Sequence, residues 1–71
     1  MGLSMSRDDE IDINDVGKGE EIGVEVVEWL GEKKGFPNNI LTGTVEATTK
    51  KAVLIDEEWV PKSQVEKAWL L

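Results

Sequence analysis

The sequence predicts an all-β fold in which five short strands form a small barrel. The chain has 71 residues, which is enough for one domain. From residue 22 onward, short stretches rich in Val, Ile, Thr and Trp are separated by turns rich in Gly, Asn, Pro and acidic residues. No helical segment is expected to cover a sheet face, so the sheet should curl on itself. Closure of the sheet also removes exposed strand edges.

The first two strands are expected on either side of a long loop. Residues 22–30, IGVEVVEWL, nearly alternate between apolar and other side chains, which favours a strand. In that strand Trp29 falls on the same side as Glu25, the polar side. The Gly, Pro and Asn content of residues 31–39 predicts a loop. Alternation returns over residues 40–48 and predicts the second strand.

Three shorter strands are expected in the second half. Residues 51–55, KAVLI, form an apolar run typical of a strand covered on both faces. A fourth strand at residues 59–60 ends at Pro61, which has no N–H for a ladder hydrogen bond. One 3₁₀ turn over 62–65 then leads into a last strand over 66–71. The predicted core residues are Val24, Val26, Leu41, Val45, Val53, Ile55, Val60, Val65 and Leu70.

The negative charge is concentrated at the front of the chain. The protein carries 15 acidic and 8 basic residues, a net charge of −7. Residues 1–21 hold seven of the acids and two of the bases, and therefore account for −5. Such a segment buries too little apolar surface to offset the entropy of ordering it. We expect residues 1–19 to form a disordered acidic arm, or simply a solubilising tail, and residues 20–71 to form the barrel domain.

The composition excludes several functional classes. Without His or Cys, the chain has no disulfide, no thiolate or ordinary zinc site, and no imidazole base. The acidic cluster of residues 8–15 does not fit a calcium loop, because Ile13 and Val16 fall where Gly or an acid is needed. We therefore predict no catalytic residue, metal or cofactor, and no enzyme. Because apolar runs reach only four residues, no membrane span is expected, and the predicted location is cytoplasmic.

The segment between the last two predicted strands resembles part of a known domain family. Val60-Pro61-Lys62-Ser63-Gln64-Val65 is similar to the segment of SH3 domains in which an apolar residue, Pro and small polar residues form a 3₁₀ turn. The resemblance implies an SH3-like barrel, and an OB-like barrel is the second choice. SH3 domains bind Pro-rich peptides on a surface of Tyr and Trp, and this chain has no Tyr.

A longer pattern points to a second group of proteins. KAVLID at residues 51–56, followed by WVPKSQV at residues 59–65, resembles a pattern in small uncharacterised proteins of phages and archaeal mobile elements. This resemblance implies a similar compact β domain and no established activity.

Tryptophan and lysine side chains are the main functional signal. An exposed Trp is an anchor for a partner or a stacking surface for a base, whereas a buried Trp fills a core. Lysine pairs on predicted turns supply positive charge, although they could also merely balance the acids and keep strand edges soluble. The predicted binding residues are Trp29, Lys33, Lys34, Lys50, Lys51, Trp59 and Lys62.

Two functions are consistent with these residues. The first is a non-enzymatic protein-binding module, an adaptor or inhibitor, whose acidic surface engages a partner with a basic surface. The second is a single-stranded nucleic-acid binder whose acidic arm folds over its own lysines and is autoinhibitory. The net charge opposes the second, because it repels phosphate at long range. A monomer or a weak homodimer is expected, the latter through the apolar end Trp69-Leu70-Leu71.

Overall fold

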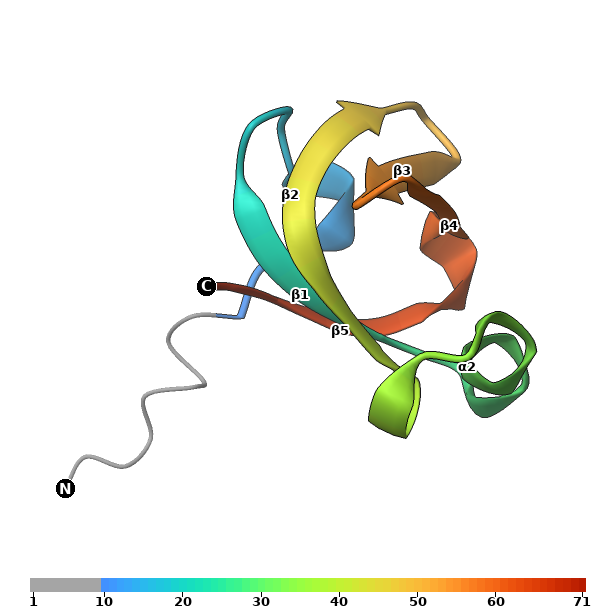
Figure 1. The fold of residues 1–71 in the computed structure, drawn as a ribbon. Helices are drawn as coiled ribbons and strands as arrows, with labels where there is room; N and C mark the ends of the chain where they lie inside the picture. The colour runs from blue at the N-terminus through green and yellow to red at the C-terminus, as the bar shows by residue number, and fades with distance from the viewer. Residues whose placement is uncertain (1–9) are drawn as a thin grey trace, which may run out of the picture.

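A curled antiparallel sheet is the framework of the described chain. The computed structural model describes residues 10–71 (Figure 1). Within them, the strand order across the sheet is β4-β3-β2-β1-β5, and every neighbouring pair is antiparallel. The strands are β1 (Glu21–Val26), β2 (Ile40–Thr48), β3 (Ala52–Ile55), β4 (Glu58–Pro61) and β5 (Val65–Leu70). The prediction of a small β-rich fold with five strands is confirmed in this coarse form.

The last four strands begin and end within one residue of their predicted positions. They are joined by short turns, including the two-residue turn Asp56-Glu57 between β3 and β4. The predicted 3₁₀ turn before the last strand is η3 (Lys62–Gln64). These elements follow local signals, namely period-two alternation and turn-forming residues, which explains the agreement.

The sheet is not closed into a barrel within residues 10–71. β4 and β5 are its two edge strands, and no strand pairing joins them. β4 ends at Pro61, which cannot donate to a further strand. The free edge of β5 is taken instead by the chain's own front segment: Glu10 forms a β-bridge with Trp69, and the Ile11 N–H donates to the Ala68 carbonyl at 2.8 Å. The expected barrel is therefore an open, curled sheet.

The segment before β1 is part of the fold. Its 3₁₀ turn η1 (Ile13–Asp15) carries Ile13 into the core, and Val16 is buried as well. Part of the arm expected over residues 1–19 thus contributes to the packing, because these apolar side chains find cover against the sheet. Residues 1–9 of that arm lie outside the described residues.

The apolar core contains most of the predicted positions. Those confirmed as buried are Val24, Val26, Val45, Val53, Ile55 and Val60. Leu41 and Val65 are half-buried against this core. The prediction for Leu70 is wrong: it is 42% exposed, since it occupies the last position of β5. The buried apolar residues that the sequence analysis did not include are Ile13, Val16, Ile22, Leu30 and Ala68.

A short helix replaces part of the first predicted strand. The strand expected over residues 22–30 ends at Val26, and helix α2 (Glu28–Lys34) follows. The helix ends at Gly35, whose φ of 77° is in the left-handed region. A 3₁₀ turn, η2 (Pro37–Asn39), then leads into β2. The predictions of a strand through residue 30 and of a loop from residue 31 are therefore wrong.

The residues of α2 explain why a helix forms there. Glu28 lies in its first turn and Lys33 and Lys34 in its last, which suits the helix dipole. Gly35 adopts the left-handed conformation that commonly ends a helix. Leu30, only 4% exposed, packs the helix against the core. Burial of Leu30 and these end signals outweigh the β propensity of the preceding valines.

Candidate binding face of tryptophans and lysines

Two of the three tryptophans line one open hollow between α2 and β4. Trp29 on the helix is 57% exposed, and Trp59 on the strand is 46% exposed. The hollow has a volume of about 510 Å³. We call it the tryptophan hollow, and its lining residues are Trp29, Leu30, Lys33, Lys34, Glu58, Trp59 and Pro61.

Local packing directs both indoles outward. On β4, Val60 is fully buried, so the alternation of a strand places its neighbour Trp59 on the outer side. On α2, the side chain of Leu30 turns into the core, and the preceding Trp29 is left exposed. Trp29 is thus exposed, although it belongs to a helix and not to the polar side of a strand.

An ion pair connects the two walls of the tryptophan hollow. Lys34 Nζ on α2 lies 3.3 Å from Glu58 Oε1 on β4. It is the one ion pair found between side chains of residues 10–71. Both partners are partly exposed, so a pair of this kind contributes about 0–1 kcal/mol. Its main consequence is geometric, because it links the helix that carries one indole to the strand that carries the other.

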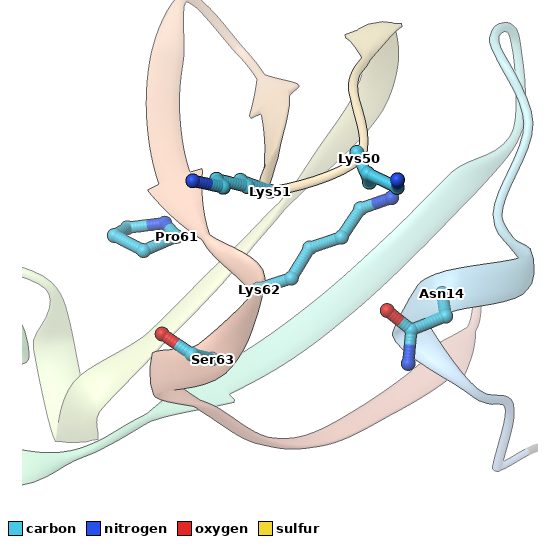
Figure 2. A pocket seen from close by; sticks show the side chains of 6 residues that line it. All are labelled: Asn14, Lys50, Lys51, Pro61, Lys62 and Ser63. Carbon is cyan, nitrogen blue, oxygen red and sulfur yellow. The ribbon is translucent and has the colours of Figure 1, made fainter.

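A second hollow gathers three lysines (Figure 2). Its volume is about 560 Å³. We call it the lysine hollow, and its lining residues are Asn14, Lys50, Lys51, Pro61, Lys62 and Ser63. In Figure 2 the amino groups of Lys50 and Lys62 point toward one another, while that of Lys51 points away. None of the described residues that line this hollow is acidic.

Backbone hydrogen bonds fix the two segments that carry these lysines. Lys50 and Lys51 lie on the turn between β2 and β3, which is closed by the Thr49 N–H donating to the Ala52 carbonyl at 2.8 Å. The N–H of Lys62, in η3, donates to the Lys51 carbonyl at 2.8 Å. The turn and η3 are therefore held side by side, and the lysines of both segments line one hollow.

All seven predicted binding residues line one or other of these hollows, and Pro61 lines both. We call the two hollows together the tryptophan–lysine face. The sequence analysis missed the other lining residues, which are Asn14, Leu30, Glu58, Pro61 and Ser63. Pro61 and Ser63 belong to the segment that resembles SH3 domains, and that resemblance indicated only a fold. Asn14 carried no usable signal, because it reaches the face through the packing of η1.

The face is locally positive on an acidic protein. Five lysines line it, against one carboxylate among the described lining residues, that of Glu58. Twelve of the thirteen acids in residues 10–71 lie outside both hollows. Exposed lysines that are not neutralised by nearby acids attract anions in a salt-dependent way. The arrangement can therefore hold a ligand that carries both flat rings and negative charge.

Within the described part of the chain, no three Asp or Glu side chains lie together as they would around a metal ion. Residues 10–71 contain no helix with the length and apolar character needed to cross a membrane. Comparison with protein-family models, with curated proteins and with solved structures found no match. The tryptophan–lysine face is therefore the candidate functional site.

Proposed function

We propose that this protein is a non-enzymatic binding module for single-stranded nucleic acid. The observation that carries the proposal is the grouping of two exposed indoles, Trp29 and Trp59, next to the three lysines of the adjoining hollow. Bases stack on exposed aromatic rings in a sequence-tolerant manner, and lysines neutralise the phosphates between them. A catalytic role is not part of the proposal, since His and Cys are absent from the sequence.

The net charge of −7 does not rule out this ligand. At 0.15 M salt, exposed charges more than about 8 Å apart are largely screened, so the nearest charges dominate binding. On the face these are mostly lysines. Remote acids slow the approach of a polyanion at low salt and have little effect on the bound complex. This local excess supports nucleic acid over the reading in which the lysines only balance acids.

A protein partner with a basic surface is the second candidate. Its support is the distribution of acids, most of which lie outside the two hollows and cover the rest of the described surface. Such a partner would dock away from the tryptophan–lysine face and act through charge complementarity. An adaptor or inhibitor role belongs to this candidate.

An SH3-like arrangement of the strands belongs to the same proposal. The strand order β4-β3-β2-β1-β5 and the 3₁₀ turn between β4 and β5 support it. Origin from a phage or archaeal mobile element, a cytoplasmic location, and a monomeric or weakly dimeric state stay predictions.

Tryptophan fluorescence tests the proposed ligand. A short oligothymidine is titrated into the full chain at low salt while indole emission is recorded. Saturable quenching that weakens steeply with added salt is expected, because stacking quenches the exposed indoles and phosphate contacts release counterions. The weakest non-specific binding has a dissociation constant of about 100 µM. Emission that is unchanged up to that oligonucleotide concentration would reject nucleic acid and favour the basic protein partner.

A further inference from the structure

The lysine hollow is lined by several like charges. The amino groups of Lys50 and Lys62 point toward each other across it (Figure 2). No carboxylate within residues 10–71 forms an ion pair with either of them. Charges of the same sign repel one another, so this arrangement favours an anion between them.

The polar neighbours of these lysines do not neutralise them. The amide nitrogen of Asn14 donates to Asp12 Oδ1 at 3.1 Å, so that the amide oxygen is left as an uncharged acceptor for an ammonium group. The hydroxyl of Ser63 accepts a hydrogen bond from Gln64 Nε2 at 3.3 Å and keeps its own proton free to donate. The described side chains that line the hollow therefore offer ammonium and hydroxyl donors, and the adjacent Asp12 carboxylate is hydrogen-bonded to Asn14.

The site is also held in place by the backbone. The hydrogen bond from the Lys62 N–H to the Lys51 carbonyl joins the two segments that carry the lysines. A ligand then has to order only side chains and no loop, which lowers the entropic cost of binding. Pro61 also lines the tryptophan hollow, so the two hollows share a boundary residue.

We propose that the lysine hollow is a binding site for a phosphate dianion. A phosphate monoester carries a charge of about −1.5 to −2 at pH 7, more than the single charge of the diester within a strand. The pair formed by Lys50 and Lys62 therefore favours a terminal phosphate over an internal one. The inferred ligand rests on the proposed function. Together with the phosphate site, that function makes the preferred ligand a single strand with a phosphorylated end, whose terminal bases stack in the tryptophan hollow.

The first experiment compares strand ends. Fluorescently labelled oligothymidines of one length, with either a terminal phosphate or a terminal hydroxyl at the unlabelled end, are titrated with the full chain and followed by anisotropy. Both the 5′ and the 3′ end are tested. About fivefold tighter binding of one phosphorylated form is expected, from one added charge near two lysines. Equal affinity of phosphorylated and hydroxyl strands would overturn the preference for ends and leave the proposed function intact.

The second experiment uses inorganic phosphate alone. Phosphate is titrated at constant ionic strength, and the backbone amide resonances of the full chain are followed by NMR. Saturable shifts confined to residues 49–51 and 62–64 are expected, with sodium chloride as the control. Such shifts without any oligonucleotide binding would retain the phosphate site and reject the proposed function. Shifts that do not saturate, or that chloride reproduces, would overturn the site.

Matched variants separate the site from net charge. The double variant Lys50→Gln with Lys62→Gln should lose the preference for phosphorylated ends and the response to inorganic phosphate. The control, Lys18→Gln with Lys67→Gln, changes the charge equally at lysines outside both hollows and should keep both properties. Equal losses in the two double variants would mean that the response comes from overall charge and would overturn the proposal.

Discussion

The indole of Trp69 lies over Gly23 on the neighbouring strand. The two residues are directly paired in the β1–β5 ladder, and a Cβ placed on Gly23 would stand 2.6 Å from the ring. An aromatic ring that covers a strand glycine supplies the packing that the glycine lacks. Trp69 is therefore a structural residue, whereas the other two tryptophans are exposed on the tryptophan–lysine face.

A side chain at Gly23 should destabilise the protein. Gly23→Val forces the ring of Trp69 to move, and overpacking of this kind costs about 1–3 kcal/mol. Urea unfolding measures the loss as a lower midpoint. Gly17→Ala is the matched control, since nothing lies within 4 Å of a Cβ at that position. Equal stability of Gly23→Val and the wild type would show that the ring does not depend on the glycine.

The turn between β3 and β4 should gain stability from a glycine. Asp56 and Glu57 both have positive φ, 51° and 66°, as in a type I′ turn, which commonly has Gly at the second position. Glu57→Gly removes the strain of a side chain there, and an increase of about 0.5–1 kcal/mol in unfolding free energy is expected. A thermal melt measures it, with Glu57→Gln as the control that retains Cβ. A lower melting temperature for the glycine variant would contradict the turn assignment.

Loss of the Glu58 carboxylate should strengthen binding of oligonucleotide. Glu58 is the one acid among the described residues that line the tryptophan–lysine face. Glu58→Gln frees Lys34 and removes a repulsive charge, so that affinity should rise about two- to fivefold at low salt. Unfolding free energy should change by less than about 1 kcal/mol, because the pair is exposed. Glu46→Gln, on the exposed side of β2, is the control. An equal effect of both variants would assign the gain to net charge.

The exposed indoles should affect binding and not stability. Trp29→Ala and Trp59→Ala should each weaken oligonucleotide binding, since a stacked base contributes about 1–3 kcal/mol. Anisotropy of a labelled oligothymidine measures the affinity, and far-UV circular dichroism checks the fold. Trp69→Ala should instead lower the melting temperature, because it uncovers Gly23. Unchanged affinity in both single variants of the exposed tryptophans would refute stacking on this face.

Shortening the chain should show where the folded part begins. Deletion of residues 1–19 removes Ile13 and Val16 from the core. It should lower stability, because loss of a buried aliphatic side chain costs about 2–5 kcal/mol. Deletion of residues 1–9 retains both side chains. It is therefore the variant that tests the autoinhibition expected of the acidic arm. That shorter deletion should raise oligonucleotide affinity if the arm competes for the lysines. Equal unfolding midpoints for the two truncated chains would contradict the packing of η1.

Much of the fold could be predicted because its signals are local. Alternation in β2 and β3, the turn residues between β3 and β4, and the stop at Pro61 each depend on a few neighbouring residues. The seven candidate binding residues could be chosen in the same way, since Trp and Lys indicate binding by residue type. For Trp29 the residue type indicated a candidate binding residue, although the expected strand is a helix.

Other features were decided by contacts between distant segments. The helix α2 persists because Leu30 packs into the core, and the β5 edge is covered by residues 10–11 instead of β4. The curl of the sheet places Trp29 and Trp59 in one hollow. It also places Lys50 and Lys62 in another. The sequence by itself thus determined where most strands and turns lie and which residue types are available for binding. Only the tertiary structure decided which of them share a surface, because burial and pairing between remote segments leave no short-range pattern in the chain.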